Sequence, residues 1–303
     1  MRSAERRERR LSDLVRAAER RLRAAKVSYG HGTTNARDEA VYLTLHALGL
    51  PPDALALRWD CEATAREEAR AASLVTRRLA QRKPAAYLTH EAWLGEFRFY
   101  VDERVIVPRS YIAELLRDDL APWLPRPSRV KRVLDLCTGS GCLAVLLAHH
   151  FSRAHVDATD ISRGALAVAR RNVSKYHLGT RIKLQHSDLF AELSGNRYDV
   201  IVSNPPYVTA SAMRRLPVEH RREPAIALAG GKDGLDLVRR IVQEAPQYLS
   251  PNGWLIVETG HARRRVERAF PRLPFIWPET SGGADCVFLI DRETLQRGLK
   301  VAG

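Results

Sequence analysis

The alternation of strand-like and helix-like segments in the C-terminal part of the chain constrains its fold more than any other feature. The strand-like runs are short and apolar, at 132–136, 155–159, 182–186, 198–202 and 254–258. Helical patterns follow at 141–150, 164–173, 235–249 and 262–270. This alternation predicts a parallel sheet covered by helices, and the apolar pair 275–277 and 287–290 predicts a closing hairpin. We therefore expect an α/β fold with a seven-stranded Rossmann-like sheet whose last strand is antiparallel.

The N-terminal part has a different pattern, with apolar residues at helical spacing. Helices are expected at 11–25, from Asn35 to Gly49, and from the capping box that begins at Thr64 as far as Lys83. An alternation of period two near 97–101 then predicts a hairpin. We expect a small helical bundle at 1–85, opened by a frayed basic arm, a hairpin linker at 86–107, and one large domain at 108–303.

The four residues Asn204-Pro205-Pro206-Tyr207 directly follow the strand predicted at 198–202. Proline has no N–H group, so two consecutive prolines cannot continue a sheet ladder, and the chain must leave the sheet in a stiff turn. Carboxyl ends of parallel strands are where open α/β sheets bind ligands. The side-chain oxygen of Asn204 and the backbone oxygen of Pro205 are both acceptors. The motif is therefore expected to bind a planar NH2 group of a substrate.

A glycine-rich turn follows the strand at 132–136. Glycine at such a turn lets the backbone approach a ligand, and the next helix directs its first N–H groups at that ligand. The residues expected to bind a cofactor here are Cys137, Thr138, Gly139, Ser140 and Gly141. Gly139, Gly141 and Ala144 also match the dinucleotide fingerprint, so the loop alone leaves a dehydrogenase open.

Three carboxylates identify the cofactor. Asp160 ends the second strand, where a carboxylate accepts the hydroxyl groups of a ribose. Asp188, after the third strand, is placed to accept an adenine amino group. Asp135, at the start of the loop, would repel a pyrophosphate but attract an ammonium group. S-adenosyl-L-methionine has an ammonium group, a ribose and an adenine but no phosphate, so the residues predict a methyltransferase that acts on an NH2 group.

With these motifs in place, the chain resembles the HemK-like protein-(glutamine-N) methyltransferases over nearly its whole length. The segments that carry the resemblance are Val107-Pro108-Arg109-Ser110, Cys137-Thr138-Gly139-Ser140-Gly141-Cys142, Asn204-Pro205-Pro206-Tyr207, Glu223-Pro224 and Gly231-Lys232-Asp233-Gly234-Leu235. They are more similar to the branch that acts on ribosomal protein L-three than to the branch that acts on release factors, which usually has Gly where Cys137 stands.

The resemblance implies a class I methyltransferase fold with a bundle that recognises the substrate. It implies that Arg109, Ile161, Leu189 and Asn204 also contact the cofactor, and that Glu223 joins Asn204, Pro205 and Tyr207 in binding the substrate. Asn204, Pro205, Pro206 and Tyr207 are the expected catalytic residues. The expected reaction is methylation of a glutamine side-chain nitrogen, on a large-subunit ribosomal protein or, as the alternative, on a release factor.

Two further alternatives come from the residues themselves. DNA adenine amino-methyltransferases hold their substrate amine with the same four residues, but they usually carry a base-reading domain, for which the segment after Tyr207 leaves no room. A non-catalytic RNA-binding assembly factor would use the basic surface alone. Binding of S-adenosyl-L-methionine separates this last reading from the others.

Composition provides expectations about partners, location and the state of the cysteines. The net charge of +14 suggests a polyanion near the substrate, either rRNA or a ribosome-assembly intermediate. No apolar run is long enough to span a membrane and no signal-peptide core is present, so we expect a cytoplasmic protein. None of the four cysteines lies in a Cys-x-x-Cys pair, so the sequence indicates reduced thiols and no metal site.

Overall fold

The computed structural model describes residues 9–51, 54–117, 120, 123–124, 126–193 and 195–300. Most of the predicted basic arm lies outside these residues. The chain divides into two compact units, one formed by Met1–Ala92 with Pro217–Arg222 and the other by Trp93–Leu216 with Glu223–Gly303. In the described ranges, no helix has the length and apolar character needed to cross a membrane.

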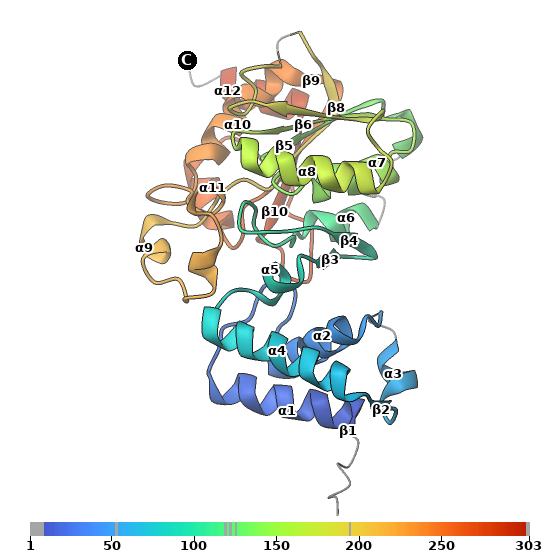
Figure 1. Ribbon diagram of the computed structural model, residues 1–303. Helices are drawn as coiled ribbons and strands as arrows, with labels where there is room; N and C mark the ends of the chain where they lie inside the picture. Colours follow the sequence, from blue (N-terminus) through green and yellow to red (C-terminus); the bar gives the residue numbers. More distant parts are fainter. Residues whose placement is uncertain are drawn as a thin grey trace, which may run out of the picture. The chain divides into compact units, whose positions relative to one another are not determined.

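The first unit is a helical bundle (Figure 1). Its main helices are α1 (Leu11–Ala24), α2 (Ala36–Leu48) and α4 (Ala65–Gln81), so the three predicted helices are confirmed. The shorter elements are α3 (Leu55–Arg58), α5 (Ala85–Thr89), η3 (His220–Arg222) and the paired strands β1 (Arg9–Arg10) and β2 (Glu62–Ala63).

Local sequence explains where the long helices of the bundle begin. The side chain of Asn35 accepts a hydrogen bond from the backbone N–H of Asp38 at the start of α2. Thr64 and Glu67 form the predicted capping box of α4, in which each side chain bonds to the other's backbone. The apolar faces then bury Val15, Leu22, Leu43 and Val75 in one core.

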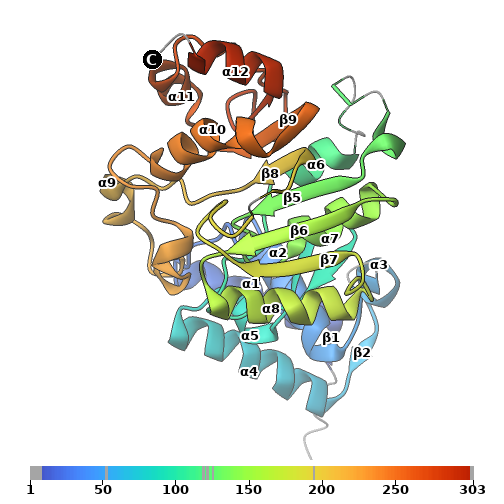
Figure 2. The ribbon, with the colours of Figure 1, turned by 90° about the horizontal axis from the view of Figure 1, so that it is seen from above.

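A six-stranded sheet forms the centre of the second unit (Figure 2). Its strands are β5 (Arg132–Leu136), β6 (His155–Asp160), β7 (Ile182–His186), β8 (Tyr198–Ser203), β9 (Leu249–Glu258) and β10 (Val287–Asp291). They lie in the order β10-β9-β8-β5-β6-β7, and all are parallel except β10, which pairs antiparallel with β9.

The prediction of a seventh strand at 275–277 is wrong. Those residues make only an isolated bridge, in which Ile276 and Leu289 exchange two backbone hydrogen bonds of 2.9 and 2.8 Å. Pro274 and Pro278 stand on either side of the bridge, and neither has the N–H group that a longer ladder would need. The antiparallel last strand is confirmed.

Helices cover both faces of the sheet. Alternate strand residues point to opposite faces, so Val133 and Val200 lie in one apolar core while Leu134 and Ile201 lie in the other. The first core includes residues of α6 (Ile112–Arg117), α7 (Cys142–His150) and α8 (Arg163–Lys175). The second includes residues of α10 (Asp236–Tyr248), α11 (Arg263–Ala269) and α12 (Arg292–Lys300). The helix α12 follows the last strand, in a part of the chain where no helix was predicted.

The remaining elements are short. The predicted hairpin is limited to β3 (Ala92–Leu94) and β4 (Phe97–Phe99), which pair in a sheet of their own. The first residues of the predicted linker at 86–107 are not part of it, because they belong to the helix α5, which follows Pro84 and has Tyr87 and Leu88 buried. The other short helices are α9 (Ala210–Met213), η2 (Pro127–Arg129) and η4 (Ala225–Ala227).

Candidate functional site

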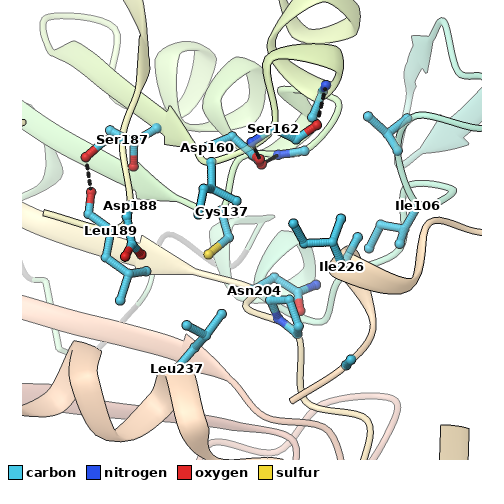
Figure 3. Close-up of a pocket in the computed structure, with 18 of the residues that line it drawn as sticks. Ile106, Cys137, Asp160, Ser162, Ser187, Asp188, Leu189, Asn204, Ile226 and Leu237 are labelled. Carbon is cyan, nitrogen blue, oxygen red and sulfur yellow. Dashed lines mark hydrogen bonds between the residues drawn. The ribbon is translucent and has the colours of Figure 1, made fainter. Parts of the chain in front are cut away.

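A cavity of about 450 Å³ lies at the carboxyl ends of β5, β6, β7 and β8 (Figure 3). Its volume is in the range of pockets that hold small molecules. Eight of the residues predicted for the site line it: Cys137, Gly139, Asp160, Ile161, Asp188, Leu189, Asn204 and Pro206. The strand ends bring these residues together from positions as far apart in the chain as 137 and 206.

The glycine-rich loop has left-handed backbone at three positions. Cys137, Gly139 and Gly141 have φ angles of 59°, 56° and 77°. Gly141 has a second reason to be glycine, because a Cβ atom there would lie 3.0 Å from the Cβ of Ala169. A left-handed φ is costly for a residue with a side chain, so Cys137 occupies a position that glycine adopts more easily. Its sulfur faces the cavity (Figure 3).

The buried side chain of Asn172, on α8, fixes the loop from behind. Its Nδ2 donates to the backbone oxygen of Ser140 at 2.9 Å and to that of Tyr100 at 3.0 Å. Thr138, Ser140 and Gly141 do not line the cavity. They shape the turn, and Asn172 is a supporting residue that the sequence pattern did not reveal.

Asp160 is held at the edge of the cavity by the backbone. Its Oδ2 accepts from the N–H of Gly139 at 2.9 Å, and its Oδ1 accepts from the N–H of Ser162 at 2.8 Å. Burial raises the pKa of this carboxyl, and the two N–H groups oppose that shift. Each carboxylate oxygen has further lone pairs that can accept ligand hydroxyl groups.

Asp135 lies beneath the loop and does not line the cavity. Its Oδ2 accepts from the hydroxyl of Thr138 at 2.6 Å. Its Oδ1 is buried and has no hydrogen-bond partner among the described residues. Burial raises the pKa of Asp135 to about 7, although Thr138 and the N–H of Ala144 oppose the shift. The contact of Asp135 with an ammonium group of the cofactor therefore stays a prediction, because the carboxyl is buried away from the cavity.

The walls of the cavity combine charged side chains with exposed apolar ones. Asp188 forms an ion pair of 2.9 Å with Arg240, and both line the cavity. Ile161 and Ile226 also line it and remain 51% and 59% exposed, although large apolar side chains are usually covered. Figure 3 shows Ile226 beside Ile106, across the cavity from Asp188, so the cavity between them has apolar and acidic walls that fit a flat ring with an amino group, such as adenine.

Asn204 is oriented by two acceptors. Its Nδ2 donates to Oε1 of Glu258 at 3.1 Å and to the backbone oxygen of Arg109 at 3.3 Å. Pro205 is buried and Tyr207 partly buried, and neither lines the cavity. Gly260 makes room for the Tyr207 ring, because a Cβ atom there would lie 2.8 Å from it. Burial raises the pKa of Tyr207 above its usual value, which keeps its hydroxyl neutral.

The structure pairs Arg109 with Glu223. The guanidinium makes two hydrogen bonds of 2.7 Å to the carboxylate, and the N–H of Val107 donates to the same carboxylate at 2.9 Å. The Glu223 side chain is fully buried. Neither residue lines the cavity. The pair fastens the loop before α6 to the segment around Glu223.

Sequence reasoning missed several residues of the site. Glu258, the end of β9, is 2% exposed and contacts Asn204. Its signal was present, because a carboxylate that ends an apolar strand is the pattern that identified Asp160. The other missed lining residues include Arg104, Ile106, Ile226, Leu237 and Arg240. Nothing in their local sequence distinguishes them from surface or core residues.

One group of potential metal ligands gathers elsewhere in the second unit. His261, Asp285 and Cys286 place ligand atoms within 4.8 Å of one another. Burial raises the pKa of Cys286 to about 12, so its thiol keeps the proton that metal binding would have to displace. We assign no metal to this group.

Two parts of the chain match models of known protein families. Residues 118–220 match the family model for the methyltransferase small domain, and residues 13–89 match that for the PrmC N-terminal domain. Among solved structures, a methyltransferase from Pyrococcus furiosus is similar, with a TM-score of 0.48 and 16% identity over 74% of this chain and 98% of that one.

Curated relatives are far more similar. The ribosomal protein uL3 glutamine methyltransferase of Bordetella pertussis is 55% identical over 94% of this chain and 96% of its own length. The enzymes with the same name from Neisseria gonorrhoeae and Burkholderia pseudomallei are 53% and 52% identical, over 94% and 93% of this chain and 95% and 94% of their own lengths. The chain therefore belongs to the family of ribosomal protein uL3 glutamine methyltransferases, and it is an enzyme that uses S-adenosylmethionine.

Proposed function

We propose that this enzyme methylates the side-chain amide nitrogen of a glutamine in ribosomal protein uL3, and that Asn204 holds that amide. The orientation of Asn204 carries the proposal. Both acceptors near its Nδ2 fix the nitrogen, so the Oδ1 is left to accept a hydrogen bond from a substrate NH2 group. The relatives named for uL3 are 49–55% identical to this chain, and their name is the basis for proposing uL3 as the substrate.

The cavity fits S-adenosylmethionine. Asp160 would accept the ribose hydroxyl groups, and Asp188, Ile161 and Ile226 would surround the adenine. The loop at 137–141 and the unpaired oxygen of Asp135 would lie toward the amino-acid end. When bound, the cofactor supplies a methyl group on a sulfonium sulfur, which keeps the bonding electron pair and becomes a neutral thioether.

The protein's own contribution is positioning. A glutamine nitrogen is a weak nucleophile, because its lone pair is delocalised into the carbonyl group. The Oδ1 of Asn204 and the backbone oxygen of Pro205 would accept its two N–H bonds and fix its position, and Tyr207 would pack on the planar amide. As the new N–C bond forms, the nitrogen gives up one of its two protons to a nearby acceptor. The ion pair between Arg109 and Glu223 contributes indirectly. It fixes the backbone at Arg109, whose oxygen accepts the hydrogen bond that orients Asn204.

We place the reaction in the cytoplasm, because the relatives are named for a ribosomal protein. We also include rRNA or an assembly intermediate among the partners, because the net charge is +14. Phosphate contacts weaken steeply with salt. Transfer to an assembly intermediate is therefore expected to exceed transfer to free uL3 and to fall as salt rises.

The test is incubation of the purified enzyme and tritiated cofactor with ribosomal protein from cells that lack the enzyme. A labelled uL3 band, with the label on one glutamine, is the expected result. Release factors and adenine-containing DNA serve as parallel substrates. Label that appears mainly in either of them would refute the proposed substrate.

Asp160→Asn is expected to weaken cofactor binding about 10- to 100-fold, because a charged hydrogen bond contributes about 1.5–3 kcal/mol. Turnover at saturating cofactor should change little, because Asp160 contacts no reacting group in the proposed arrangement. Calorimetric titration gives the dissociation constant. Asp60→Asn is the matched control, since Asp60 is exposed on the bundle. Equal affinity of the Asp160 variant and the wild type would remove Asp160 from the cofactor site.

A further inference from the structure

We propose that Glu258 is a positioning residue, which selects the orientation of the Asn204 amide so that its oxygen rather than its nitrogen faces the substrate. The inference rests on the proposed function, because it concerns how the substrate amide is held. It assigns a role to a residue that lies outside the Asn-Pro-Pro-Tyr motif, at the end of a different strand.

The orientation of a carboxamide is decided by the groups around it. Asn204 has two neighbours on its Nδ2 side, the carboxylate of Glu258 and the backbone oxygen of Arg109. Both can only accept hydrogen bonds while Glu258 is ionised, so the NH2 group must point at them. In the described part of the chain, no group donates to the Oδ1 of Asn204. Glu258 thus favours one of the two possible orientations of the Asn204 amide, the one in which the Oδ1 acceptor is directed toward the cavity.

Glu258 itself is held by the start of α6. Its Oε2 accepts from the hydroxyl of Ser110 at 2.6 Å and from the backbone N–H of Tyr111 at 2.9 Å. Its Oε1 accepts from Asn204. The two oxygens have different partners, so the carboxylate cannot rotate without breaking these bonds. The segment at 107–112, which the resemblance singled out as Pro108-Arg109-Ser110, therefore orients Asn204 both directly and through Glu258.

The charge of Glu258 is essential to this arrangement. Burial raises its pKa to about 7, and the bonds from Ser110 and Tyr111 and the nearby charge of Arg109 oppose that shift. Besides Arg109 and Tyr111, the titratable groups that face it are Tyr207 and Cys286. Burial keeps the hydroxyl of Tyr207 and the thiol of Cys286 protonated near neutral pH. A protonated Glu258 would accept from Asn204 more weakly and could donate to it instead, which would turn the Asn204 nitrogen toward the substrate.

Glu258→Gln tests the proposal with almost no change in size. The oxygen of the new amide is needed by Tyr111, so its NH2 group would face the NH2 group of Asn204. Asn204 then has to flip and present a donor to the substrate, and kcat for methyl transfer to uL3 is expected to fall about 10²- to 10³-fold. Cofactor affinity should be unchanged. Glu293→Gln, on the exposed face of α12, is the matched control.

A double variant separates positioning from packing. Asn204→Asp alone places two carboxylates together and is expected to be inactive. In Asn204→Asp with Glu258→Gln, the glutamine NH2 can donate to one Asp oxygen and leave the other for the substrate. The total charge equals that of the wild type, so the double variant should be more active than either single variant. Rescue should be partial, because an Asp oxygen would face the backbone oxygen of Arg109.

Nuclear magnetic resonance of the wild type gives a readout that needs no activity. The Asn204 side-chain NH2 signal, assigned by its loss in Asn204→Ala, is expected to shift with a midpoint near pH 7 in the wild type and to be insensitive to pH in Glu258→Gln. The pH dependence of the methyl-transfer rate alone would not identify Glu258 as the titrating group, because the pKa of Asp135 is also about 7.

The outcomes are distinct. A wild type that does not methylate uL3 refutes the proposed substrate but leaves the titration to decide on Glu258. Wild-type turnover by Glu258→Gln, a double variant no better than the single variants, or an Asn204 NH2 signal that is the same in the wild type and in Glu258→Gln would each overturn the positioning role.

Discussion

Asn204→Ala is expected to lower kcat for glutamine methylation at least about 10³-fold, while the dissociation constant of the cofactor stays close to that of the wild type. One preorganised hydrogen bond to the reacting group contributes about 10²- to 10³-fold to kcat. Asn204 lines the cavity at the end of β8, away from the Asp160 and Asp188 ends of β6 and β7. Its loss also leaves Glu258 without the donor on its Oε1. The variant should therefore retain its cofactor and lose the reaction.

Two measurements check this result together. Single-turnover transfer of a tritiated methyl group to uL3 gives the rate of the chemical step, and calorimetric titration gives the cofactor affinity. Asn252→Ala is the control, since Asn252 is exposed in β9. If Asn204→Ala transferred methyl groups within about tenfold of the wild-type rate, a loss of less than about 1.4 kcal/mol, the amide would be held by other residues.

Much of the site could be predicted from sequence because the chemistry lies at strand ends. Apolar runs locate the strands, and the polar residue that ends each run must reach the same edge of a parallel sheet. Asp160, Asp188 and Asn204 satisfy this rule, and all three line the cavity. Caps are equally local, which is why Asn35 and the Thr64 capping box were correctly placed.

The features that could not be predicted from the sequence are those that depend on contacts between residues distant in the chain. Glu223 lies 114 residues from Arg109, and nothing local reveals that the two form a buried pair. Glu258 lies 54 residues from Asn204 and was interpreted only as the end of a strand. The 275–277 segment has the apolar character of a strand, but its pairing is limited by the flanking prolines. The segment at 217–222 belongs to the bundle although it follows the substrate motif in the chain.

That segment is held in the bundle by a buried charge network. The Arg78 side chain is fully buried and donates to Glu39 at 2.8 Å and to the backbone oxygen of Ser28 at 3.0 Å. Glu219, also fully buried, lies 3.4 Å from Arg78 and 2.7 Å from Arg82. Burial raises the pKa of Glu39, and Arg78 opposes the shift. Arg78 thus contacts two buried carboxylates, and Arg82 shares the one that lies on the segment that continues from Tyr207.

Arg78→Ala is therefore expected to destabilise the bundle by about 3–5 kcal/mol, because it leaves the buried carboxylate of Glu39 without its cation and leaves Glu219 with Arg82 alone. Hydrogen exchange of peptides from α2 and α4 measures this loss separately from the second unit. Arg77→Ala changes the exposed neighbour on the same helix and should alter stability by less than about 0.5 kcal/mol. Protection of α4 equal to that of the wild type would contradict the role of the network.

The same variant also separates the roles of the two units. Every residue that lines the cavity belongs to the second unit, so Arg78→Ala should leave the cofactor dissociation constant unchanged. If the bundle recognises the substrate, as the resemblance implies, a loosened bundle lowers kcat/KM for uL3, because the 217–222 segment loses the contact between Glu219 and Arg78. Steady-state kinetics with uL3 at saturating cofactor measures this effect. Unchanged kcat/KM in a variant whose α4 exchanges freely would show that the bundle has no part in recognition.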